Sequence, residues 1–103
     1  MLDIHFIREN KDIVKEGARK KHVAVDIDEL LKLDDERRDL MTQVEALRAE
    51  QNKANEGITN ASGEEREGLI AAMRRVKDEL ATLEEKLKDV MQTWKMYMLQ
   101  VPN

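Results

Sequence analysis

The 103-residue chain has no cysteine, one proline, and a single tryptophan, tyrosine and phenylalanine. Without cysteine it forms neither disulfides nor thiolate metal sites, so the sequence carries no mark of a redox compartment. Aromatic residues make up 3% of the chain and charged residues 39%. A compact globule would need more bulky apolar residues, so this composition favours a long helix or a coiled coil within one domain.

Long apolar runs and an excess of positive charge are also missing. No segment approaches the roughly 18 apolar residues of a membrane-spanning helix. The acidic, interrupted start is unlike a signal peptide: MLDIHFIRENKDIV. We therefore expect a cytoplasmic protein without a membrane partner. The formal net charge is −4. The overall electrostatic field of the chain therefore does not attract nucleic acid, and any nucleic-acid contact requires a local basic patch.

Residues 26–57 are expected to form the first of two long helices. Asp26 and Glu29 have the spacing of a capping box at its start. Gly57 fits the left-handed C′ position that commonly follows the end of a helix. Residues 1–25 before it are expected to form short helices and an extended link.

The second long helix is expected over residues 63–101, after a tip loop at residues 58–62. Ser62 and Glu65 form another capping-box pair at its start. The helical pattern stops at Pro102, which cannot continue it.

Both long segments carry a heptad seam, in which residues recur at alternating steps of three and four. The first seam comprises Leu30, Leu33, Arg37, Leu40, Val44, Leu47, Gln51, Ala54 and Ile58. The second comprises Leu69, Met73, Val76, Leu80, Leu83, Leu87, Val90, Trp94, Tyr97 and Val101. One antiparallel register pairs the two seams from Ile58 with Leu69 at the tip to Leu30 with Tyr97 at the base.

The predicted fold is all-α, a long antiparallel two-helix coiled-coil hairpin with short N-terminal helices packed at its base. Burial is expected to weaken toward the tip, because the layers there contain small or polar residues.

The sequence contains no pattern typical of catalysis or metal binding. His5 and His22 are far apart and have no obvious nucleophile or carboxylate partner. The carboxylates of residues 26–36 are typical of a first helical turn and an exposed face, not of a metal cage. We therefore assign no catalytic residue and no metal. Arg37 lies on the seam one layer from Trp94, where it either stacks on the ring or forms a polar layer that fixes the register.

The charges beside the seam form the candidate site. Arg48 and Lys77 occupy e positions that face each other in the antiparallel pair, and Arg74 lies on the same flank. Glu50 and Glu79 meet at g positions on the opposite flank. Two interpretations are open: the flanks are solvated faces, or the basic flank holds a phosphate backbone that supplies the missing counter-charge. The candidate RNA-binding residues are Arg48, Arg74 and Lys77, with Lys53, Arg66 and Arg75 as nearby reserves.

Three stretches resemble the N-terminal domain of bacterial-type seryl-tRNA synthetases: MLDIHFIRENKDIVKEGARKK, VDIDELLKLDDERRDL and MLQVPN. The resemblance covers essentially the whole chain, although Lys11 stands where the family commonly has proline. It implies a helical arm that projects from a dimeric catalytic body and binds the elbow and long variable arm of serine tRNA. It also implies a cytoplasmic, ATP- and Mg²⁺-dependent ligase whose catalytic domain follows a junction at residues 102–103. The resemblance implies no cofactor for this domain, no DNA partner, and no individual contact residue.

A second function class explains the hairpin equally well. A non-enzymatic coiled-coil scaffold, or a chaperone-like module that holds partner proteins, would have the same seams and flanks. It does not explain why the first two of the three stretches resemble the sequences of seryl-tRNA synthetases.

Overall fold

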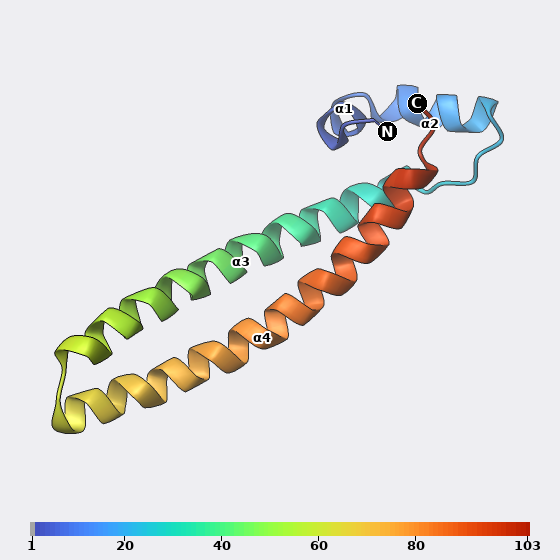
Figure 1. Cartoon of the computed structure of the whole chain (residues 1–103). Helices are drawn as coiled ribbons and strands as arrows, with labels where there is room; N and C mark the ends of the chain where they lie inside the picture. The colour runs from blue at the N-terminus through green and yellow to red at the C-terminus, as the bar shows by residue number, and fades with distance from the viewer. Residues whose placement is uncertain (1) are drawn as a thin grey trace. The chain divides into compact units, whose positions relative to one another are not determined.

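The computed structural model describes residues 2–103, in which the regular structure is entirely α-helical. The elements in chain order are α1 (Ile4–Glu9), α2 (Lys11–Lys20), α3 (Ile27–Asn60) and α4 (Gly63–Gln100) (Figure 1). The predicted all-α fold, with a long helical hairpin and short N-terminal helices, is confirmed. The chain divides into two compact units, which we call the terminal unit (Met1–Arg38 with Asp89–Asn103) and the hairpin unit (Asp39–Lys88).

The core of the terminal unit combines apolar side chains from all four helices. It consists of Ile7, Val14, Ile27, Leu30, Met98 and Val101. Trp94 and Tyr97 of α4 are partly buried against it. Each large apolar side chain removed from water contributes on the order of 1.5–3 kcal/mol, whereas helices as short as α1 and α2 are marginal alone in water. Packing into this core therefore holds the two short helices in place.

A buried carboxylate joins α1 to α3 within the terminal unit. Asp34 is 0% exposed. It accepts hydrogen bonds from Arg8 Nη2 at 2.8 Å and from Arg37 Nη2 at 2.9 Å. Arg38 Nε lies 3.6 Å from the same carboxylate, and Arg8 also reaches Asp35 at 2.9 Å. A carboxylate so fully removed from water requires this pairing, since an unpaired buried charge is strongly destabilising.

Arg37 connects this carboxylate to α4. Its guanidinium carbon lies 4.8 Å from the centre of the Trp94 ring, so the stacked arrangement is confirmed. Because the same guanidinium also donates to Asp34, the seam has a polar layer at this level as well.

The N-terminus of α3 is capped as predicted. Asp26 Oδ1 accepts a hydrogen bond from the backbone N–H of Glu29 at 3.0 Å, which satisfies one of the donors that the first helical turn leaves unpaired. Two lysines of α2 lie next to this turn: Lys11 Nζ and Lys15 Nζ are 2.6 and 2.8 Å from Asp28. These exposed ion pairs add little to the stability.

His22 has a structural role at the end of α2. Its φ of 55° is in the left-handed region. The N–H of His22 bonds to the carbonyl of Arg19, and the N–H of Val23 bonds to the carbonyl of Ala18. This is the hydrogen-bond pattern of a Schellman motif, in which glycine more often takes the left-handed place.

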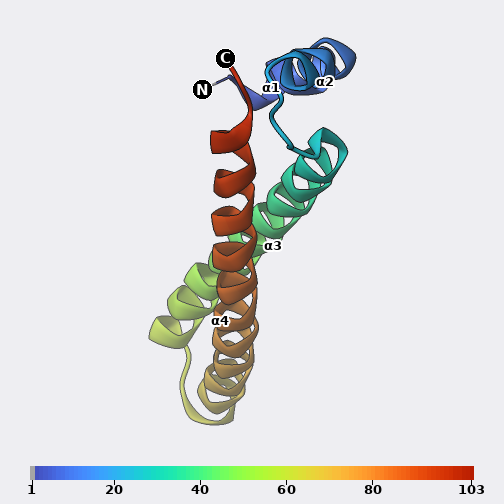
Figure 2. The ribbon, with the colours of Figure 1, turned by 90° about the vertical axis from the view of Figure 1, so that its right-hand side faces the viewer.

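The tip of the hairpin differs from the prediction. Helix α3 continues through Gly57 to Asn60, so the connection is residues 61–62 rather than 58–62 (Figure 2). The left-handed glycine is Gly63, with a φ of 63°. A single glycine costs a helix only about 1 kcal/mol relative to alanine, which flanking helical turns overcome. Gly57 instead permits close packing, because a Cβ there would lie 3.3 Å from Leu69 Cδ1. Helix α4 ends at Gln100, one residue before the predicted end.

The predicted seams are confirmed by burial. Every seam position of both long helices is buried or half-buried. In the hairpin unit, Leu40, Val44 and Leu80 are buried, whereas the seam residues nearest the tip are only half-buried. Burial therefore weakens toward the tip, as expected from the small and polar residues of those layers.

The glycines at the tip provide a test of the revised turn. Gly63→Ala should lower the free energy of unfolding by about 1 kcal/mol, because alanine is strained in the left-handed region. Gly68→Ala, in an open helical position, should raise it by about 0.5–1 kcal/mol. Urea unfolding monitored by circular dichroism measures both, and equal effects would contradict a left-handed turn at Gly63.

Asp34 provides a second stability test. Burial raises the pKa of its carboxyl, but hydrogen bonds from Arg37 and Arg8 lower the pKa by more, so it lies below its usual value. The ionised carboxylate therefore stabilises the fold fully above about pH 4, and this contribution is lost as the pH falls through the lowered pKa. Asp34→Asn should cost roughly 3 kcal/mol at pH 7 and flatten the loss of stability in acid.

Asp35→Asn is the matched control for that substitution. Its side chain is 66% exposed, so its loss should change the free energy of unfolding by less than about 1 kcal/mol. If both variants gave the same small change in urea unfolding, Asp34 would not be the anchor of the terminal unit.

Candidate nucleic-acid interface

The candidate cations Arg74 and Lys77 lie on one side of α4 in the hairpin unit. They are three residues apart on the helix, so their side chains are neighbours, and both are exposed. Arg66 lies about three helical turns before Lys77, and Lys88 lies about three turns after it. Both therefore fall on the same side of α4 as Lys77. Lys88 was missed by the sequence analysis, although its helical spacing from Lys77 could have revealed it.

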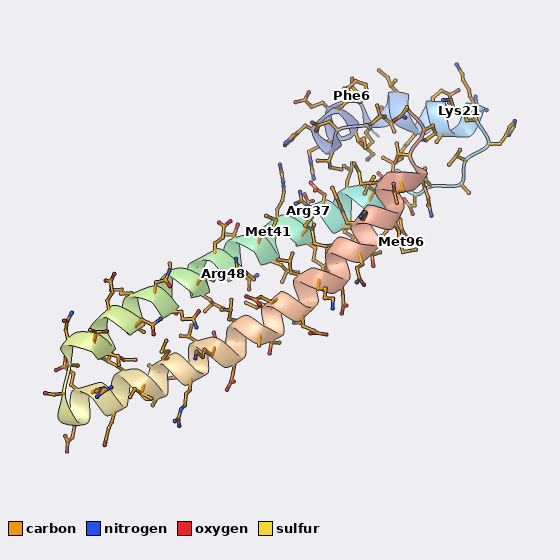
Figure 3. The ribbon with its side chains drawn as sticks, viewed as in Figure 1. Phe6, Lys21, Arg37, Met41, Arg48 and Met96 are labelled. Carbon is orange, nitrogen blue, oxygen red and sulfur yellow. The ribbon has the colours of Figure 1, made fainter. Side chains whose placement is uncertain are left out.

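Arg48 of α3 completes this set. Its side chain is 60% exposed, and its guanidinium reaches across to α4 (Figure 3). The residues that follow Arg48 on the same side of α3, Asn52, Asn55 and Thr59, are uncharged and exposed. We call Arg48, Arg66, Arg74, Lys77 and Lys88 the basic flank.

The prediction that Arg48 meets Lys77 as an unrelieved like charge is wrong. Arg48 Nη2 lies 3.2 Å from Glu84 Oε1. Glu84 follows Lys77 by one heptad and therefore also occupies an e position. The guanidinium turns from the like charge toward this carboxylate because a long side chain can reach past its own level.

The two acids predicted to meet on the opposite flank lie close together. Glu50 of α3 and Glu79 of α4 line one shallow hollow together with Ala72, Val76 and Arg75. Arg75 therefore lies among carboxylates and not on the basic flank. Lys53, three residues after Glu50, falls on that side of α3 too. These two reserves therefore lie on the side of the acids, opposite the basic flank.

The tip is also acidic. Glu64 and Glu65 occupy the first turn of α4, where negative charge is favourable to the helix dipole. Glu56 and Glu67 are exposed nearby in the sequence. Carboxylates in these places repel phosphate, so the tip is a poor site for a polyanion.

Over residues 2–103, no three His, Asp or Glu side chains are close enough together to hold a metal ion. No helix in this described part is both long and apolar enough to span a membrane.

Comparison with known proteins covers the whole chain. A family model described as "Seryl-tRNA synthetase N-terminal domain" matches residues 1–103. A serine–tRNA ligase of Deinococcus radiodurans is 41% identical over 103 residues, which are 100% of this chain and 24% of that protein. The corresponding enzyme of Desulfitobacterium hafniense is 37% identical over 105 residues, 100% of this chain and 25% of that protein. That of Thermomicrobium roseum is 39% identical over 104 residues, 100% of this chain and 23% of that protein. The chain thus spans about a quarter of the length of these relatives.

Proposed function

Because this chain belongs to the family of seryl-tRNA synthetase N-terminal domains, we propose that it is the tRNA-binding arm of a serine–tRNA ligase. The parent enzyme joins serine to its tRNA in the cytoplasm, with ATP and Mg²⁺ bound by a catalytic part that this chain does not span. Residues 102–103 form the junction to that part, and the parent enzyme is a homodimer.

The RNA partner in this proposal is serine tRNA, bound at its elbow and long variable arm. Double-helical RNA is recognised mainly by its shape, its phosphates and its 2′-hydroxyls. A row of cations along one side of a long helix is suited to such a surface, because it follows a phosphate backbone without reading bases. Arg66, Lys77 and Lys88 are about 16 Å apart along α4, from the rise per residue of an α-helix.

The observation that carries the proposal is the unequal distribution of charge on the hairpin unit. The basic flank attracts phosphate, whereas the acidic flank around Glu50 and Glu79 and the acidic tip repel it. Repulsion from the wrong faces restricts the orientations in which RNA can dock. An arm with one attractive side holds the tRNA in one direction, so that its acceptor end can be delivered to a distant catalytic domain.

The alternative of a non-enzymatic scaffold or chaperone-like module has no specific support in the structure. The apolar seams are consumed in pairing α3 with α4 and are buried or half-buried along their whole length. The seams themselves are therefore not available for gripping a partner protein.

Two double variants with equal charge change test this function. Arg74→Gln with Lys77→Gln should weaken binding of serine tRNA about tenfold and lower the slope of log affinity against log salt by about two, since two phosphate contacts are lost. Lys53→Gln with Arg75→Gln removes the same charge from the acidic side and should change the affinity less than about twofold. Fluorescence anisotropy with serine tRNA, with and without its variable arm, measures both.

In the complete ligase, the first double variant should raise KM for tRNA and leave ATP-dependent serine activation unchanged. Equal effects of the two double variants on tRNA affinity would remove the basic flank from the interface. Loss of the variable arm from the tRNA should weaken binding to the unmodified protein, and unchanged affinity would exclude that arm as the docking element.

A further inference from the structure

Glu84 is a carboxylate within the row of cations on α4. By helical spacing it lies between Lys77 and Lys88 on the side of the basic flank. Its neighbour Glu85 is rotated about 100° further around the helix, toward solvent. An acid at this place weakens the attraction of the flank for phosphate, so its presence calls for an explanation.

Glu84 forms an ion pair with Arg48, and this pair explains its place in the row of cations. The two side chains come from different helices, and their charged atoms are 3.2 Å apart. They are 44% and 60% exposed, so water and ions have access to both. A pair this exposed is weak and can be exchanged for another partner.

We propose that Glu84 is a built-in competitor for RNA phosphate, which occupies Arg48 until the RNA backbone displaces it. The inference rests on the proposed function of the basic flank and concerns the regulation of that site. A phosphate presents the same pair of acceptor oxygens to a guanidinium as a carboxylate does. RNA binding therefore exchanges the Arg48–Glu84 pair for an Arg48–phosphate pair.

The exchange limits affinity in two ways. Breaking the ion pair offsets part of the gain from the new phosphate contact, and the freed Glu84 carboxylate then lies close to the RNA backbone. Both effects speed dissociation of the tRNA. An arm that must release each charged tRNA gains from this, because product release sets the turnover of many enzymes.

The test is Glu84→Gln, with Glu85→Gln as the control for the loss of one negative charge. In the complete ligase, Glu84→Gln should tighten binding of serine tRNA about three- to tenfold at physiological salt and slow its dissociation by a similar factor. Glu85→Gln should change the affinity by less than about twofold. Equal tightening by both variants, or weakening by Glu84→Gln, would overturn the proposal.

A double-mutant cycle shows whether the effect acts through Arg48. In an Arg48→Gln background, Glu84→Gln should keep only the part of its tightening effect that comes from removing repulsion, since no guanidinium remains to be released. Full tightening in that background would show a general charge effect and contradict the exchange. The proposed function fails separately, if neutralising Arg74 and Lys77 leaves tRNA binding unchanged.

Discussion

The arrangement of the terminal unit depends on one buried charge. Asp34 lies in α3 with no exposure and is held by Arg8 of α1 and by Arg37, which also covers Trp94 of α4. A buried carboxylate tolerates few arrangements of its partners, because each unpaired oxygen is costly. The apolar core makes association of these four helices favourable, and the charge cluster restricts how they associate. Two helices too short to be stable alone thereby gain a defined position.

The hairpin unit is held together by its apolar seam rather than by a buried charge. Its seam provides the apolar contact between α3 and α4 but becomes thinner toward the tip, where Gln51 and Ala54 replace large side chains. The charged residues on either side of the seam are unevenly distributed. Arg48, Arg74 and Lys77 lie on one side, whereas Glu50 and Glu79 lie on the other together with Arg75 and Lys53. The same two helices thus provide both the scaffold and an asymmetric surface for a polyanion.

The sequence was sufficient to predict features that depend on periodicity. Seams with steps of three and four, the cap at Asp26 and the antiparallel pairing all follow from local spacing, and the structure contains them. It was not sufficient where one residue type has two physical uses. Gly57 was interpreted as a left-handed cap, yet it lies within α3 and admits Leu69, while Gly63 makes the turn. Asp34 was assigned to an exposed acidic face, because a carboxylate in a charged run carries no sign of the arginines that surround it.

The candidate site was predicted in part for a related reason. Heptad positions identify which side of a helix a residue occupies, so Arg48, Arg74 and Lys77 could be placed on one flank. They do not identify which neighbour a long side chain selects, and Arg48 reaches past its own level to Glu84. The reserves Lys53 and Arg75 were chosen by nearness in sequence, although helical rotation places them among the acids of the other side.

The proposed function requires that RNA lies along one side of the hairpin. Its most direct test is an NMR titration of the isotopically labelled 103-residue chain with serine tRNA, following backbone amides and the arginine and lysine side chains. Binding along the basic flank should shift the signals of Arg48, Arg66, Arg74, Lys77 and Lys88 and change those of Glu50, Arg75 and Glu79 little. Shifts centred on the acidic flank, or on Glu64 and Glu65 at the tip, would contradict it.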